Sequence, residues 1–269
     1  MYSRYIAVYE GLTHLGRTRS GNEDELLCAG AYLPARHGEA SFRGQVTAGE
    51  RGALFGVFDG MGGEAFGEEA AFLAASSAAA APPGAEDMAA GLLRSVHEMD
   101  RAVCDWARKE GVAAMGTTAV MIGLTGAEAV ICNIGDSRAY LFRDGTLKML
   151  SEDHVVKRPG QKKGPLTRWL GTGTETDILM PCVRIEPLRA GDVYLMCTDG
   201  LTDMVGDDEI LWILREHGRG AAGPLLNAAL AAGGRDNVTV IVIGITARPG
   251  RAPGSLRDRV GRLGASKNT

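Results

Sequence analysis

Two hydrophobic periodicities alternate along the chain, one typical of helices and one typical of strands. Apolar residues spaced three and four positions apart between 88 and 106 predict an amphipathic helix that Asp87 caps and Gly111 ends. An alanine-rich run before Pro82 predicts another helix, because proline cannot continue one. The helices predicted in this way cover residues 64–81, 87–110, 208–216 and 224–232.

Short runs rich in β-branched and apolar residues fill most of the remaining chain. The dipeptide Asp144-Gly145 stands between two of these runs and predicts a type I′ hairpin turn. Strands dominate the middle of the chain, and the helices do not alternate regularly with them, so the layout predicts a mixed α+β fold. The predicted strands cover residues 54–58, 118–124, 129–134, 139–142, 147–150, 192–197 and 238–245.

Charge is distributed unevenly over the 269 residues. The chain has 29 Lys+Arg and 33 Asp+Glu, a formal net charge of −4, which gives no general reason to expect a nucleic-acid partner. Six basic residues and one acidic residue follow Thr246, so the part before them is clearly acidic. We predict one folded domain over residues 1–246 and a basic, disordered tail over 247–269.

The five cysteines show no close paired spacing, and their odd number argues against a disulfide framework and for a reducing compartment. The first residues lack a basic region followed by a long apolar stretch, and no apolar run is long enough to cross a bilayer. These features predict a cytoplasmic protein without a membrane partner.

Four acidic patches interrupt the chain, three of them next to apolar strand-like runs. Carboxylates on rigid strand ends can converge, and two carboxylates held close together repel each other or bind cations. Oxygen ligands without His or Cys suit Mg²⁺, Mn²⁺ or Ca²⁺ rather than zinc. Any one patch alone is a common turn or solvated loop, but together they predict a hard-metal site. The patches are Asn22-Glu23-Asp24, Asp59-Gly60-Met61-Gly62-Gly63, Thr198-Asp199-Gly200-Leu201 and Arg235-Asp236-Asn237.

With the segments around these patches, the chain closely resembles the metal-dependent protein phosphatases of type 2C, in particular the compact bacterial serine/threonine phosphatases. The resemblance covers roughly residues 10 to 245, in the order of the family. The matching segments are 19–24 (RSGNED), 57–63 (VFDGMGG), 116–119 (GTTA), 135–140 (GDSRAY), 152–154 (EDH), 166–171 (LTRWLG), 198–203 (TDGLTD) and 236–239 (DNVT).

The resemblance implies a fold and a set of residue roles. The fold would be a four-layer sandwich of two stacked antiparallel β-sheets with helices on both outer faces, and residues 1–246 would form the catalytic domain. Two Mn²⁺ or Mg²⁺ ions would be the cofactors. In the implied roles, Asp59 would bridge both metals, the Gly60 carbonyl would bind one, and Asp199 and Asp236 would bind the other. Glu23 and Asp24 would hold metal-bound waters, and Arg19 would bind the substrate phosphate. Asp136, Asp199 and Asp203 would bind a third metal.

Phosphomonoester hydrolysis explains these residue types independently. Two hard cations can activate a water and screen the charge on the phosphoryl oxygens. Glycine at position 60 lets the backbone approach a metal closely. Arg19 suits phosphate because its planar fork can bind two oxygens at once. Asp136 could instead only cap the turn before Ser137, and both readings stay open.

Other polar residues carry structural expectations. His154 is expected to be a hydrogen-bonding residue of its loop and not a catalyst. Thr117 and Thr118 are expected to be buried near the site. Cys197 is expected in the core, since no cysteine is followed by an anion-binding loop and an arginine.

The chain departs from the family pattern at two places. Met61 and Glu64 stand where many relatives have a histidine, so the resemblance implies that metal-bound water protonates the leaving group, with Glu64 as an alternative. The flap between His154 and Leu166 is cut down to a short basic segment, 155–165. This segment could contact the substrate or be only a solvated turn.

The sequence therefore predicts a monomeric, cytoplasmic serine/threonine phosphatase that acts on phosphorylated proteins and opposes a serine/threonine kinase in signalling. Two alternatives remain at this point. A catalytically silent sensor of the same fold would usually have lost metal carboxylates, and a hydrolase of small phosphoesters would fit the short flap.

Overall fold

The computed structural model describes residues 4–50, 53–61, 66–156, 164–172 and 179–248. Most of the basic segment 155–165, residue Glu64 and residues 249–269 of the predicted tail lie outside these ranges, so the predictions made for them stay untested.

One antiparallel sheet contains the N-terminal strand and the last strand at its centre. Its order is β3-β1-β12-β11-β8-β9, and β1 pairs with β12 from Tyr5↔Ala247 to His14↔Val238. Its members are β1 (Tyr5–His14), β3 (Ala40–Thr47), β8 (Arg138–Arg143), β9 (Thr146–Met149), β11 (Val193–Cys197) and β12 (Val238–Ala247).

The second antiparallel sheet has the order β10-β7-β6-β4-β2, and the short β5 pairs with the end of β4. Its members are β2 (Asp24–Cys28), β4 (Leu54–Met61), β5 (Gly116–Thr117), β6 (Ala119–Leu124), β7 (Glu128–Ile134) and β10 (Cys182–Pro187). Because β4 runs on to Met61, Asp59 and Gly60 belong to the strand itself and not to a turn after it.

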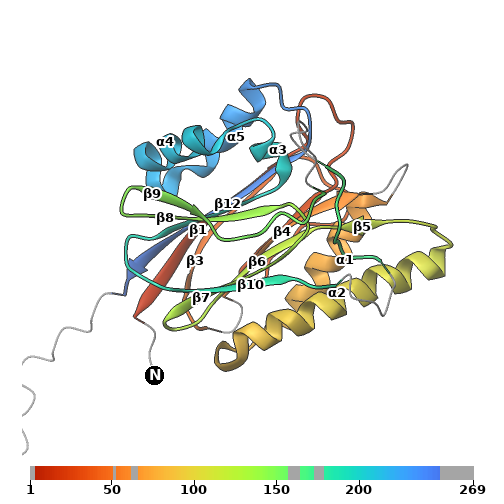
Figure 1. Cartoon of the computed structure of the whole chain (residues 1–269), viewed down its shortest axis with the longest axis horizontal. Coiled ribbons are helices and arrows are strands. Elements are labelled where there is room, and N and C mark those ends of the chain that lie inside the picture. The colour runs from red at the N-terminus through yellow and green to blue at the C-terminus, as the bar shows by residue number, and fades with distance from the viewer. Residues whose placement is uncertain (1–3, 51–52, 62–65, 157–163, 173–178, 249–269) are drawn as a thin grey trace, which may run out of the picture.

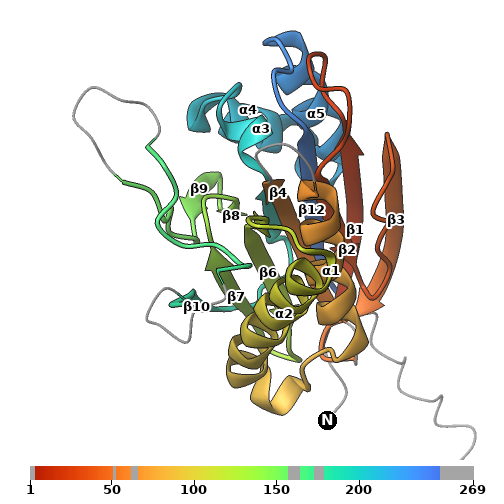
Figure 2. The same ribbon diagram turned by 90° about the vertical axis from the view of Figure 1, so that its right-hand side faces the viewer.

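The two sheets are stacked, with helices on both outer faces (Figures 1 and 2). The outer helices are α1 (Gly67–Ala80), α2 (Met88–Glu110), α4 (Asp207–His217) and α5 (Ala222–Ala231). Helices α1 and α2 cover the second sheet, and α4 and α5 cover the first. A third apolar cluster, which includes Phe55 and Ile241, fills the space between the sheets. This is the predicted four-layer α+β sandwich.

Short helical turns lie between the larger elements. They are α3 (Asp199–Thr202) and the 3₁₀ turns Ala85–Asp87 and Gly218–Gly220. Among the described helices, none is both long and apolar enough to cross a membrane.

Two local predictions can be checked in the same frame. Asp144 and Gly145 both have positive φ, 51° and 76°, as the type I′ hairpin requires. The predicted capping bond of Asp87 is wrong: this residue precedes α2 without a side-chain cap, because its carboxylate accepts a hydrogen bond from Arg94 at 2.8 Å.

Candidate active site

Asp24 and Asp59 face each other on neighbouring strands. Asp24 begins β2, Asp59 lies near the end of β4, and the antiparallel register places them directly opposite. Each lies two residues from a core residue of the inter-sheet cluster, Leu26 and Val57, so both point to the same side. The two carboxylates therefore lie at one end of the space between the sheets.

Thr198 connects this pair to the other sheet. It follows β11, and its Oγ1 donates to Asp24 Oδ2 at 2.8 Å while accepting the backbone N–H of Thr239 at 3.1 Å. Asp199 comes next and begins α3, and the N–H of Asp203 donates to the Asp199 carbonyl one turn later. The end of β11 thus brings the segment 198–203 up to the buried Asp24.

Asp236 and Asn237 stand directly before β12 and hold the loop between β1 and β2. Arg19 Nη2 donates to Asp236 Oδ2 at 2.8 Å. The Asn237 side chain accepts the N–H of Glu23 at 2.8 Å and donates to the carbonyls of Leu15 and Gly21. No role for Asn237 is predicted from the sequence, since an Asp-Asn pair usually indicates a turn. In the structure it fixes the segment that carries Arg19 and Glu23.

The acidic side chains of the site influence each other's ionisation. Burial raises the pKa of Asp24 to about 7, and the nearby charges of Asp236 and Glu23 act in the same direction. Burial also raises the pKa of Glu23, with smaller contributions from Glu68 and Asp236. The hydrogen bond to Asp236 raises the pKa of Arg19, and the charges of Glu23 and Asp59 add to it. Negative charge is therefore concentrated around the guanidinium of Arg19.

The residues of this site match a metal ion in the type of their donor atoms and in their negative charge. The candidate ligands are all oxygens, and a divalent cation would relieve the repulsion that accompanies burial of Asp24. Within the described ranges, no three Asp, Glu, His or Cys side chains form a group that could hold a metal. The Asp236 carboxylate is hydrogen-bonded to Arg19 instead. The residues fit hard cations, with Arg19 in competition for one ligand.

Thr117 and Thr118 hydrogen-bond to the backbone of Asp59. Thr117 Oγ1 and the Thr118 N–H donate to the Asp59 carbonyl, and the Asp59 N–H donates to Thr118 Oγ1 at 3.1 Å. Thr118 Oγ1 also lies 2.7 Å from Ser137 Oγ, next to Asp136 in the turn between β7 and β8. The prediction that both threonines are buried near the site is confirmed.

Gly60 has a packing role that the sequence did not predict. A Cβ at this position would overlap with the carbonyl oxygens of Gly67, where α1 begins, and of Glu23. The Gly60 N–H donates to the same Glu23 carbonyl at 3.1 Å. Glycine is therefore required here by the contact of β4 with α1 and with the loop before β2.

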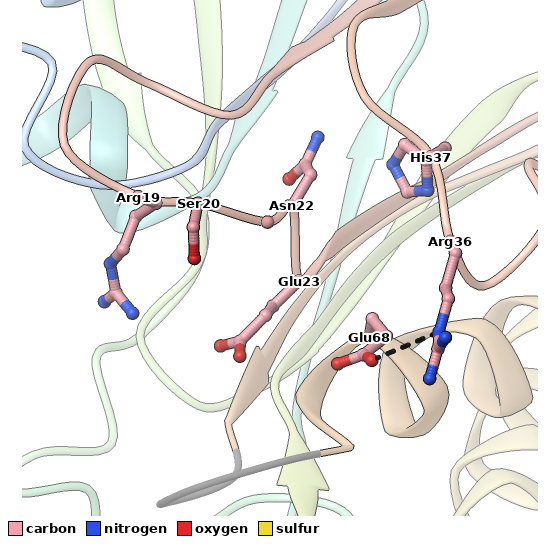
Figure 3. Close-up of a pocket in the computed structure, with 8 residues that line it drawn as sticks. Arg19, Ser20, Asn22, Glu23, Arg36, His37 and Glu68 are labelled. Atoms are coloured by element: carbon pink, nitrogen blue, oxygen red, sulfur yellow. Dashed lines mark ion pairs between the residues drawn. The ribbon is translucent and has the colours of Figure 1, made fainter.

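A polar cavity of about 310 Å³ opens beside these residues. Its lining comes from residues 19–23, from Arg36 and His37 in the loop between β2 and β3, and from Glu68 in the first turn of α1. Figure 3 shows Arg19 on one side of Glu23, and Arg36 and Glu68 on the other. The proposed phosphate ligand Arg19 therefore shares one cavity with a second arginine.

Two further expectations are met. His154 is buried and structural, because its Nδ1 accepts the N–H of Gly135 at 3.1 Å. Cys197 is fully buried, and burial raises the pKa of its thiol to about 12, so it is a core residue and not a nucleophile.

Comparison with known proteins identifies the family. The sequence profile described as Protein phosphatase 2C matches residues 17–162, and the chain belongs to this family. Serine/threonine protein phosphatase PstP of Mycobacterium tuberculosis is 34% identical over 235 residues, 78% of this chain and 45% of PstP. Serine/threonine phosphatase stp of Listeria welshimeri is 31% identical over 210 residues, 70% of this chain and 82% of that protein. The chain thus spans less than half the length of PstP.

Solved structures show the same fold. A crystal structure of the catalytic domain of PstP in complex with two manganese ions matches with a TM-score of 0.74 and 30% identity, covering 90% of this chain and 99% of that one. PppA, a regulatory component of T6SS in Pseudomonas aeruginosa, matches with a TM-score of 0.71 and 26% identity, covering 92% and 99%.

Proposed function

We propose that this protein is a metal-dependent serine/threonine protein phosphatase. The observation that carries the proposal is the pairing of Asp24 with Asp59 at the rim of one sheet, where Thr198 at the end of a strand of the other sheet binds Asp24 and Arg19 binds Asp236. Membership of the protein phosphatase 2C family and the names of the relatives PstP and stp support the same activity.

In this proposal the site would hold two Mn²⁺ or Mg²⁺ ions. The ligands would be the side chains of Asp59, Asp199 and Asp236 and the carbonyl of Gly60. When bound, the ions supply an activated water and screen the charge of the phosphoryl group. Glu23 and Asp24 would orient waters in the site from behind the ligands. A third, weaker site would use Asp136 and Asp203 together with Asp199.

The chain's own residues bind and orient the substrate. Arg19 would bind two phosphoryl oxygens through its planar guanidinium, in exchange for its present hydrogen bond to Asp236. Asn237 keeps the segment of Arg19 and Glu23 in place through its three hydrogen bonds. Thr198 keeps Asp24 aligned by donating to one of its oxygens.

The substrates proposed are proteins phosphorylated on serine or threonine, in opposition to a serine/threonine kinase. We also propose a monomer that acts in the cytoplasm. Both proposals rest on the sequence features described above and on the names of the relatives.

The test uses the purified chain with an aryl phosphate and with a phosphothreonine peptide. Both should be hydrolysed with added Mn²⁺ or Mg²⁺ and not after chelation, and calorimetry should detect Mn²⁺ binding. Hydrolysis of the aryl phosphate alone would indicate a small-phosphoester hydrolase. Absence of turnover with intact Mn²⁺ binding would indicate a catalytically silent sensor, and either result would overturn the proposal.

A further inference from the structure

Charged and polar residues surround the cavity beside Arg19. Every described residue in its lining is charged, polar or glycine, so none of these contributes an apolar side chain. Its volume of about 310 Å³ lies at the small end of the range for ligand sites. Such a cavity suits one polar side chain of a larger ligand better than a cofactor or an apolar segment.

The loop that carries Arg36 is fixed at several points along its length. The Leu33 N–H donates to the buried Glu25 Oε1 at 3.1 Å, and Asn22 Nδ2 donates to the Gly38 carbonyl at 3.1 Å. Glu39 lies 2.8 Å from His14 Nε2. Because both ends of the loop are held by β1, β2 and the segment before β2, Arg36 starts from a defined position at the cavity.

The Arg36 side chain itself is engaged only weakly. Its Nε lies 3.8 Å from Glu68 Oε1, too far for a hydrogen bond, and the side chain is 87% exposed. It donates no hydrogen bond to any other residue in the described part of the chain. By contrast, Arg138 and Arg143 each donate hydrogen bonds to a carboxylate from two nitrogens. An exposed ion pair of this kind contributes little, so Arg36 can exchange Glu68 for another anion.

Charge within the cavity favours an anionic group at the Arg36 end. Arg19 and Arg36 lie on opposite sides of Glu23 (Figure 3). Burial lowers the pKa of His37, so its ring is neutral at pH 7 and adds no charge. A basic side chain at this end would be repelled by the charge of Arg36, whereas an anionic side chain would meet the exposed N–H groups of Arg36 and compete with Glu68 for them.

We propose that this cavity receives the substrate residue beside the phosphorylated one, and that Arg36 selects an anionic side chain there. The proposal rests on the proposed function, because it takes Arg19 as the phosphate ligand at the other side of the cavity. The anion is a carboxylate or a second phosphate, which share the oxygens that a guanidinium binds. Arg36 is thus a specificity-determining residue and not a catalytic one.

The test measures kcat/KM with Mn²⁺ for phosphothreonine peptides that carry Glu, Gln, phosphoserine or Lys at each of the two positions before and after the phosphothreonine. The wild-type protein should prefer Glu over Gln about three- to tenfold on one side of the phosphothreonine only. Phosphoserine at that position should separate the two anion sources, since it exceeds Glu only if a second phosphate is the better ligand.

Four variants make the test specific to Arg36. Arg36→Ala should remove the preference while leaving the Gln peptide and an aryl phosphate within about twofold of wild type. Arg36→Lys should keep part of the preference, because the charge stays and the fork is lost. Glu68→Gln should increase the preference, since it removes the competing carboxylate. Arg94→Ala, an equally simple loss of an exposed arginine on α2, is the matched control and should change nothing.

The outcomes separate this inference from the proposed function. Hydrolysis of all peptides at equal rates would refute the inference and leave the phosphatase intact. An equal loss on acidic, neutral and aryl substrates in Arg36→Ala would show a structural role and would also refute it. Turnover of the aryl phosphate without any phosphopeptide would overturn both proposals.

Discussion

Arg19 holds a carboxylate that we propose as a metal ligand, and this predicts opposite effects of one mutation on two ligands. Its Nη2 lies 2.8 Å from Asp236 Oδ2. A cation that takes Asp236 Oδ2 would compete with Arg19 for this oxygen, and in our proposal the phosphate would bind the Arg19 side chain. Arg19→Ala should weaken phosphate binding but leave Mn²⁺ binding as tight as in the wild type, or tighter.

The size of each effect follows from the exposure of the pair. The two side chains are 47% and 38% exposed, so solvent screens their attraction to about 0.2–1 kcal/mol. Removing this competition should tighten Mn²⁺ binding by at most about fivefold. Hydrogen bonds to a charged phosphate contribute about 1.5–3 kcal/mol, so the KM for an aryl phosphate should rise about tenfold or more.

Calorimetric Mn²⁺ titrations and steady-state kinetics on the same preparations would measure both effects. Arg17→Ala is the matched control, because Arg17 lies in the same loop and, among the residues that the structure describes, its side chain donates only to the Leu230 carbonyl. Mn²⁺ binding several times weaker in Arg19→Ala than in Arg17→Ala would refute the reasoning. It would mean that Arg19 orders Asp236 for the metal and does not compete with it.

Three further predictions concern the acidic residues. Asp59→Asn and Asp236→Asn should each lower aryl phosphate turnover about 100-fold or more while the protein stays folded, as checked by kinetics and circular dichroism. Exhaustive chelation should abolish turnover and Mn²⁺ or Mg²⁺ should restore it; full turnover without metal would contradict the mechanism. Burial raises the pKa of Glu25 to about 8, above its value in the unfolded chain. The contribution of Glu25 to the free energy of unfolding is therefore greatest at low pH and is lost as pH rises toward 8. In chelator, the free energy of unfolding of the wild type should fall relative to Glu25→Gln by about 1.4 kcal/mol per pH unit between pH 5 and 8; a difference that stays constant with pH would rule this out.

Elements with strong local patterns were predicted well from the sequence. Helix α2 shows its stripe of buried residues at the expected spacing, and β12 is a continuous apolar run. The missed strands are β1, β2, β3, β5 and β10. Much of β1, β3 and β10 is half-exposed, and β2 and β5 are short. In these strands, pairing with neighbours far along the chain decides the structure, and no local pattern reports that pairing.

The candidate site was predicted by family resemblance more than by spacing. Arg19 and Asp236 are 217 residues apart, and Asp24 and Thr198 are 174 apart, so no local pattern could show their contacts. The supporting role of Asn237 was missed for the same reason, because its three hydrogen bonds reach back to the loop between β1 and β2. The competition between Arg19 and a metal could be seen only once the side chains were placed.

The position of the site explains how the buried Asp24 is held at the rim between the two sheets. Asp24 and Asp59 belong to one sheet, whereas Thr198 and Asp236 stand next to strands of the other. The two sheets contact each other mainly through apolar side chains, which do not fix polar groups at their rim. A few hydrogen bonds therefore hold the acidic groups in place. Thr198 and Thr239 bind Asp24 across the rim, and Arg19 and the Asn237 N–H donate to Asp236. Cations bound there would replace the Arg19 contact by stronger ones and release Arg19 for the phosphate.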